Sequence, residues 1–226
     1  MEYKIIGGAF PMVVCTLRKG ETMQDETGAM SYMTEGIKME TSTGGGLLKG
    51  LGRALSGDTI FLNYFTAEED NAEVAFSSCY PGKIIPIELN GNSIIGQKNA
   101  FLTDTKDVKL EMHFRKNLGA GIFGGEGFIL QRFSGNGTLF LEIDGDVIEK
   151  TLAPGERLLV DQGHVAAMDD TVDFDIQRVK GVKNLLIGGE GLFFATVTGP
   201  GRVWLQTMPV SKLAEAIIPF IPTKSD

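Results

Sequence analysis

The sequence is poor in the residues that mark disulfide-stapled or membrane-spanning proteins. Its 226 residues include only two cysteines, Cys15 and Cys79, which are too few for a disulfide framework. Both lie beside apolar or aromatic residues, so we expect two buried free thiols. No stretch reaches the ~18 consecutive apolar residues that a membrane helix requires, and no transmembrane segment is predicted.

Positive charge is also scarce. The chain has 21 Lys and Arg against 29 Asp and Glu, a formal net charge of −8. This balance disfavours nonspecific binding to nucleic-acid phosphates and a polybasic membrane anchor. The first residues lack a basic start followed by a long apolar run, so no signal peptide is expected. A cytoplasmic protein is the default prediction.

Catalytic motifs are missing as well. The chain has no Gly-x-Ser-x-Gly elbow and no His-x-His pair, which leaves a serine hydrolase and a cupin-type metal barrel without support. Residues 119–124 fit G-x-G-x-x-G, but a β-rich apolar run follows them where a dinucleotide site needs a helix. We therefore predict no catalytic residue and no cofactor, and an enzyme is the less favoured class.

Glycine is abundant, with 30 residues spread between short apolar runs, a pattern typical of many turns and strands. One motif of glycine, acid, small residue and three apolar residues occurs three times, at 57–62, 125–130 and 189–194. The copies are 68 and 64 residues apart. Repetition at near-constant spacing predicts a repeat architecture.

Other segments recur with this motif. A strand is expected after Gly20, Gly91 and Gly155, ending on alanine plus a bulky apolar residue. An alternating polar strand follows in each copy, and its period of two predicts one buried face. These strands are expected at 37–40, 108–114 and 172–177, and a last strand at 73–76, 138–141 and 202–205.

Two local signals complete the secondary structure. Asn136-Gly137 predicts a hairpin turn, because both central positions of a type I′ turn need positive φ. Near the end of the chain, Ser211 is expected to cap a helix over 212–218 that ends at Pro219. The apolar residues 219–222 are then expected to be non-helical.

These patterns together predict an all-β protein of one domain. It would contain three repeated sheet units, roughly 1–89, 90–153 and 154–210, followed by a C-terminal helix and tail over 211–226. A unit of this size is marginally stable alone and needs its neighbours to complete a core.

The repeated motif places an acid at the same point of each copy: Asp58, Glu126 and Glu190. If these carboxylates converge, they could hold a cation or share protons. The favoured interpretation is that each accepts backbone hydrogen bonds at a turn. His164 has acidic neighbours in sequence and is a further weak metal candidate, with an ordinary hydrogen-bonded histidine favoured.

The first unit carries an insertion with the spacing of an amphipathic helix. Its apolar and basic residues are Leu47, Leu48, Lys49, Leu51, Arg53 and Leu55. A helix that covers one end of the barrel is the favoured interpretation. A weak contact with a membrane surface or a protein partner is the alternative.

Several short segments follow one another in a characteristic order. They include Gly155-Glu156, Ala167-Met168, Lys183-Asn184, residues 188–193 and Gly201, together with the insertion and the following Phe61 and Phe65. This series resembles the family that includes the altered inheritance of mitochondria protein 24. This resemblance spans nearly the whole chain. It implies a fold similar to the tryptophan RNA-binding attenuation protein, a double-stranded β-helix type, present as three units around a pseudo-threefold axis. It transfers no catalytic residues. The absence of a mitochondrial presequence fits a prokaryotic member.

The leading hypothesis is therefore a non-enzymatic scaffold or interaction protein that binds a protein partner or associates with itself. The alternative is a small-molecule or metal-binding protein that uses carboxylates at the junctions between units. Nucleic-acid binding is the third possibility, and the acidic balance disfavours it.

Overall fold

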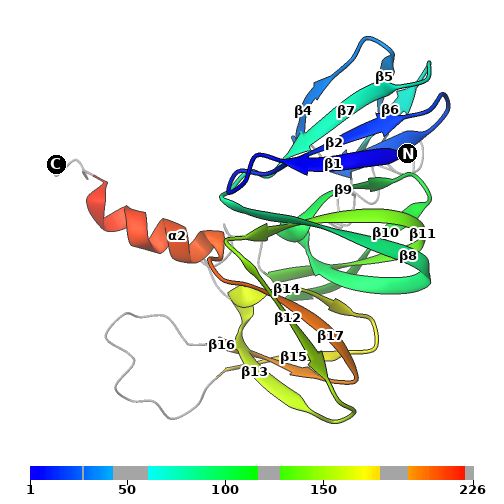
Figure 1. Cartoon of the computed structure of the whole chain (residues 1–226). Coiled ribbons are helices and arrows are strands. Elements are labelled where there is room, and N and C mark those ends of the chain that lie inside the picture. Colours follow the sequence, from blue (N-terminus) through cyan, green and yellow to red (C-terminus); the bar gives the residue numbers. More distant parts are fainter. Residues whose placement is uncertain (27, 43–60, 117–127, 179–192, 222–226) are drawn as a thin grey trace.

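The computed structural model describes residues 1–26, 28–42, 61–116, 128–178 and 193–221. Within them the chain is mostly antiparallel β-structure arranged in three sheets (Figure 1). The strands are β1 Glu2–Ile6, β2 Met12–Leu17, β3 Thr22–Glu26, β4 Met30–Met33, β5 Ile37–Ser42, β6 Leu62–Ala67, β7 Ala72–Ser77, β8 Gly82–Gln97, β9 Phe101–Thr105, β10 Val108–Lys116, β11 Phe128–Asp144, β12 Val147–Leu152, β13 Arg157–Asp161, β14 Val165–Asp169, β15 Asp173–Arg178, β16 Phe193–Thr198 and β17 Gly201–Gln206.

The first sheet has the order β1-β2-β7-β4, and the last has the order β13-β16-β15. A ten-stranded sheet lies between them, with the order β12-β17-β14-β8-β11-β9-β3-β6-β5 and with β10 paired to β11. In Figure 1 the first sheet is at one end of the molecule and the last at the other. The long strands β8 and β11 pair along nearly their whole length and form the centre.

Buried side chains gather in three clusters within the described residues. The first surrounds Phe65 and Phe76, the second Phe133 and Leu141, and the third Phe128 and Val197. Several of the strands that supply these side chains, including β2, β3, β9 and β14, carry three or four consecutive buried residues. Because successive residues of a strand face opposite sides of the sheet, both faces of these strands are covered. The predicted all-β class is confirmed.

The predicted alternating strands are confirmed as β5, β10 and β15, and the predicted last strands as β7, part of β11 and β17. The opening strands are predicted too long. β3 ends at Glu26, and Met30 begins β4. Likewise Phe101 begins β9, directly after the short 3₁₀ turn Lys98–Ala100. The alanine and bulky residue therefore lie at the start of a second strand or within it.

The predicted hairpin at Asn136-Gly137 is wrong. β11 continues through this dipeptide, and a register shift against β8 occurs between Ser134 and Asn136. The positive φ of Gly135 (115°) and Gly137 (151°) allows the irregularity without a reversal of direction. A hairpin signal and a bulge signal use the same residues, because both need positive φ.

The C-terminal helix α2 runs Val210–Ile217, so it begins earlier than predicted. Ser211 lies inside its first turn. The N-cap residue is Pro209, whose side chain makes no capping hydrogen bond. A 3₁₀ turn follows at Ile218–Phe220 and includes Pro219, so the prediction that helical structure ends before this proline is also wrong.

Cys15 is buried as expected, whereas Cys79 is exposed. No helix in the described part of the chain is long and apolar enough to cross a membrane.

Candidate functional site

Most residues singled out from the sequence lie outside the described residues. These are Asp58, Glu126 and Glu190, and the insertion from Leu47 to Leu55. Whether the three acids converge therefore stays a prediction, as does contact of the insertion with a partner or membrane. His164 is the one weak metal candidate that the structure describes.

His164 ends a short 3₁₀ turn, Gln162–His164, between β13 and β14. Its Nδ1 atom lies 2.7 Å from the backbone oxygen of Gln206. A carbonyl oxygen can only accept, so Nδ1 must carry a proton. Among the described residues, no group of three or more His, Cys, Asp or Glu side chains has metal-binding geometry. The contact fits the interpretation of His164 as a hydrogen-bonded histidine.

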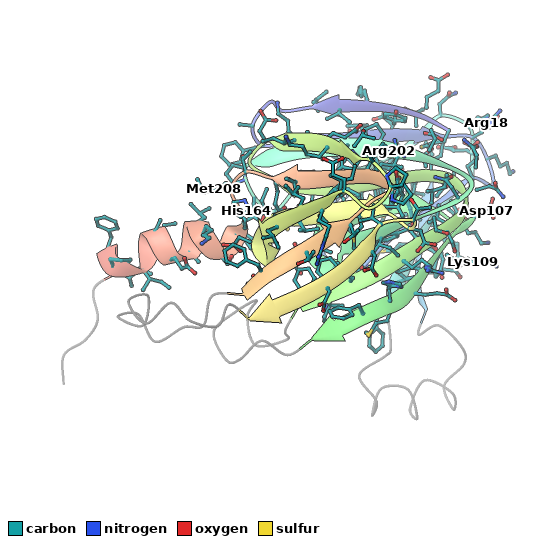
Figure 2. The ribbon with its side chains drawn as sticks, turned by 90° about the horizontal axis from the view of Figure 1, so that it is seen from below. Arg18, Asp107, Lys109, His164, Arg202 and Met208 are labelled. Atoms are coloured by element: carbon teal, nitrogen blue, oxygen red, sulfur yellow. The ribbon has the colours of Figure 1, made fainter. Side chains whose placement is uncertain are left out.

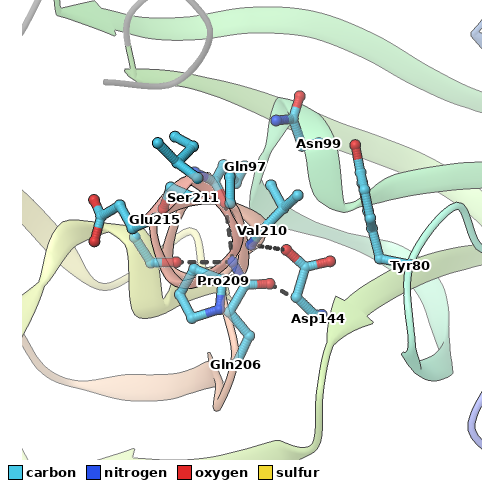
Figure 3. Close-up of a pocket in the computed structure, with 12 residues that line it drawn as sticks. Tyr80, Gln97, Asn99, Asp144, Gln206, Pro209, Val210, Ser211 and Glu215 are labelled. Carbon is cyan, nitrogen blue, oxygen red and sulfur yellow. Dashed lines mark hydrogen bonds between the residues drawn. The ribbon is translucent and has the colours of Figure 1, made fainter. Parts of the chain in front are cut away.

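A pocket lies close to this histidine, between α2 and the sheets (Figure 3). Its volume is about 400 Å³. Polar side chains from five separate strands and turns face it together with residues of α2. They include Tyr80, Gln97, Asn99, Asp144, Gln206 and Ser211. The site thus joins the end of β8, the end of β11, the end of β17 and the helix.

Gln206 organises the buried wall of this pocket. Its Nε2 donates to the backbone oxygen of Gly163 at 2.8 Å and to Oε1 of Gln97 at 3.4 Å. Its Oε1 accepts from the backbone N–H of Asp144 at 3.2 Å. Gln206 and Gln97 are each 5% exposed. Buried amides are stable only when such bonds are made, so this network fixes the position of both glutamines.

Asp144 connects the network to α2. Its Oδ2 accepts a 2.8 Å hydrogen bond from the backbone N–H of Val210, the first residue of the helix. This side chain from a distant strand therefore serves the capping role that was predicted for Ser211. Burial raises the pKa of the Asp144 carboxyl, and the bond from Val210 partly offsets the rise.

Beyond the pocket, α2 and the following residues extend away from the sheets (Figure 1). We call residues 217–221 the C-terminal segment. Its apolar side chains are exposed: Ile217 by 49%, Ile218 by 61%, Phe220 by 84% and Ile221 by 56%. No residue of α2 is buried. At the root of the helix, Pro209 is buried, and Lys212 forms a 3.2 Å ion pair with Asp161.

The sequence interpretation missed two buried acids where β3 meets β9. Asp25 and Asp104 are both 0% exposed. Burial raises the pKa of Asp25 to about 6. Hydrogen bonds from Asn63 and from the backbone of Met30 and Ala29 lower this pKa and offset part of the rise. Burial also raises the pKa of Asp104 well above its ordinary value, which the Gln24 amide partly offsets and the Asp25 charge reinforces.

The Gln24 amide donates a 2.8 Å bond to the backbone oxygen of Val108, and neither carboxylate oxygen of Asp104 accepts a bond of normal geometry in the described structure. Such an environment favours the neutral form of an acid, which is why burial raises the pKa of Asp104. Nothing in the local sequence, Leu102-Thr103-Asp104-Thr105, distinguishes this residue from an aspartate that faces solvent.

Comparisons with known proteins agree over the length of the chain. An uncharacterized protein of Streptococcus pyogenes serotype M6 is 29% identical over 225 residues, which cover 96% of this chain and 89% of that protein. A crystal structure of a Streptococcus pyogenes protein matches with a TM-score of 0.79 at 25% identity and covers 97% of this chain and 99% of the other. The family model described as mitochondrial biogenesis AIM24 matches residues 3–208. The chain therefore belongs to the AIM24 family.

Proposed function

We propose that the protein is a non-enzymatic interaction protein built from three copies of one six-stranded unit. In this proposal the units comprise β2–β7, β8–β11 and β12–β17, with β8 and β11 each counting as two strands. The second and third units then start at β8 and β12, somewhat earlier than the starts at 90 and 154 expected from the sequence, and the first starts at β2, later than residue 1. The attenuation-protein-like arrangement and its pseudo-threefold axis stay predictions.

Strand pairing supports the repeat. The last strand of each unit pairs with the first and the third: β7 with β2 and β4, the second part of β11 with β8 and β9, and β17 with β12 and β14. The fifth strand pairs with the second and the fourth: β6 with β3 and β5, the first part of β11 with β8 and β10, and β16 with β13 and β15.

The observation that carries the functional proposal is the C-terminal segment. Four apolar side chains are exposed there, at the end of α2 and in the residues that follow it. Asp144 binds the first residue of α2 to the sheets. Contiguous apolar surface is costly in water, and where it persists it usually marks a binding surface. A short amphipathic helix is a common ligand for an apolar groove. The partner we propose is a protein with such a groove.

The test compares native mass in extracts of cells that make the protein. We expect the wild type to migrate in a complex heavier than the purified protein at the same concentration. Replacing Ile218 and Phe220 by serine should shift it to the mass of the purified protein. Because both side chains are exposed, the variant should unfold at the same urea concentration as the wild type. An unchanged native mass in the double variant would refute the proposal.

A second candidate function is small-molecule binding in the pocket beside α2. The observation that favours it is a cavity of about 400 Å³ with a buried carboxyl, Asp144, and two buried amides on one wall. This composition suits a ligand with an amine or hydroxyl group and an apolar body. A panel of such compounds should raise the unfolding temperature of the wild type but not of Gln97→Leu. No shift with any compound would remove this candidate.

A further inference from the structure

Two strand-to-strand joints hold the three sheet units together, and both have the same form. β3 pairs with β9, and the end of β8 pairs with β14. In each joint the backbone N–H of the residue that follows β9 or β14 donates to a backbone oxygen of the partner strand, β3 or β8. Lys106 donates to the oxygen of Thr22 at 3.1 Å, and Asp170 donates to the oxygen of Ser93 at 3.3 Å. The second strand of one unit therefore joins the third strand of the next unit.

The third unit has a second strand with no such partner, and the first unit has a third strand with none. These strands are β13 and β4, which are edge strands of their sheets in the described structure. Figure 1 shows them at opposite ends of the molecule. They are the two halves of a joint that one chain cannot close on itself.

Register identifies which residues correspond. Thr198 and Ser134 are 64 residues apart, like the second and third copies of the repeated motif, so they occupy the same place in their units. Arg157 lies opposite Thr198, and Ser93 lies opposite Ser134. Arg157 therefore corresponds to Ser93, and Leu159 corresponds to Ile95.

The other half of the joint matches in the same way. Met33 lies opposite Val74, and Met168 lies opposite Val203. Leu17 and Leu152 end the first strands of their units and lie opposite Ala72 and Gly201. Val74 and Val203 lie two residues beyond Ala72 and Gly201. Met33 thus corresponds to Met168.

The corresponding residues differ in exposure as a missing joint requires. Ile95 and Met168 lie opposite each other and are each 1% exposed. Leu159 is 69% exposed and Met33 is 38% exposed. An apolar edge strand is a ready template for another strand, and both edges here carry the apolar residue that the closed joint buries.

We propose that β13 of one copy pairs with β4 of a second copy, so that Leu159 packs against Met33 of the partner subunit. This inference rests on the repeat proposed above and not on the C-terminal segment. The contact continues the β3–β9 and β8–β14 series across the boundary between chains. Charge favours the same alignment, because Glu35 follows β4 as Asp170 follows β14, and it would lie beside the exposed Arg157 of the other copy.

The two surfaces are different, so the contact is head-to-tail. Such contacts produce a closed ring or an open filament, and each chain can use both of its edges at once. This property allows a test that a symmetric dimer could not pass.

The test uses two variants. Leu159→Lys places a charge in the proposed contact on β13, and Met33→Lys places one in the proposed contact on β4, so each should prevent its own strand from pairing. Sedimentation velocity over a range of concentrations should show the wild type as multiples of its 24.4 kDa chain mass. Each variant alone should sediment as a single chain. A mixture of the two should form dimers and nothing larger, because one intact β13 meets one intact β4.

Ile148→Lys is the matched control, since Ile148 is 47% exposed on β12, another edge strand. It should assemble as the wild type does. A wild type that remains a single chain, variants that still assemble, or a mixture without dimers would each overturn the proposal. None of these outcomes affects the native-mass comparison of the Ile218 and Phe220 variant, so the two proposals fail separately.

Discussion

The carboxylate of Asp144 accepts a 2.8 Å hydrogen bond from the backbone N–H of Val210, which joins the end of β11 to the first turn of α2. This bond and the ion pair of Lys212 with Asp161 both hold the helix to the sheets. We predict that Asp144→Ala costs about 1 kcal/mol of stability, the usual value of a lost helix cap. Amide hydrogen exchange over residues 210–217 should accelerate.

Asp144→Asn is the control for this prediction, because its amide oxygen can still accept from Val210. Exchange in the helix should remain close to that of the wild type. Equal acceleration in both variants would mean that the charge, and not the hydrogen bond, holds the helix.

The buried acids predict an unusual pH dependence. The folded-state pKa of Asp25 is about 6 against an ordinary 3.8, and that of Asp104 is also raised. A raised pKa means that the folded state binds more protons than the unfolded state, so these groups stabilise below pH ~4 and lose that contribution as pH rises through the folded pKa.

We therefore expect Asp104→Asn to be more stable than the wild type at pH 7, by on the order of 1–3 kcal/mol. The difference between the two proteins should shrink as the pH falls toward 4. Urea unfolding at pH 4.5, 6 and 7.5 measures it. A variant that gains nothing at pH 7.5, or that gains more at pH 4.5, would contradict the assigned environment.

Gln206 and Gln97 contribute unequally to the wall of the pocket. Gln206→Leu removes the donor to Gly163 and the acceptor for Asp144, so two buried backbone groups lose their partners. We expect a loss of about 2–3 kcal/mol. Gln97→Leu removes only the 3.4 Å contact with Gln206 among the bonds described here and should cost less. Chemical denaturation of both variants gives the comparison; a larger loss for Gln97→Leu would show that the network is arranged differently.

The irregularity in β11 predicts a difference between two glycines. Gly137 has φ of 151°, and a Cβ atom there would collide with the side chain of Thr105. Gly155 has φ of 76° and open space around it. Gly155→Ala should cost about 1 kcal/mol from its left-handed conformation alone. Gly137→Ala should cost more, because the Thr105 hydroxyl must move and lose the bond that it accepts from the backbone N–H of Thr138. Similar losses for both would contradict the close approach of Thr105 to β11.

Period-two patterning was sufficient to predict β10 and β15, which each have one buried or half-buried face. It also predicted β5, although Ile37 is buried there and Met39 is 42% exposed. The continuity of β11 was not predictable from Asn136-Gly137, since positive φ serves a turn and a bulge equally. The role of Asp144 was missed for another reason. Its partner Val210 lies 66 residues away, and no local pattern encodes a cap supplied by another strand.

Asp104 shows the same limit from the side of burial. Its environment depends on the joint between β3 and β9, which brings Gln24 opposite it. The repeated pattern in the sequence predicts which segments are equivalent. It does not predict which strands of neighbouring units pair with each other. The buried acids Asp25 and Asp104 lie at one such pairing, that of β3 with β9.

Contact of the C-terminal segment with a protein partner is tested most directly by photo-crosslinking at Phe220, which is 84% exposed. A benzophenone amino acid placed there, in cells that make the protein, should yield a discrete crosslink to another protein. The same amino acid at Lys109, which Figure 2 shows at the end of the molecule away from α2, should not yield that product. Identical products at both positions, or none at Phe220, would contradict the account.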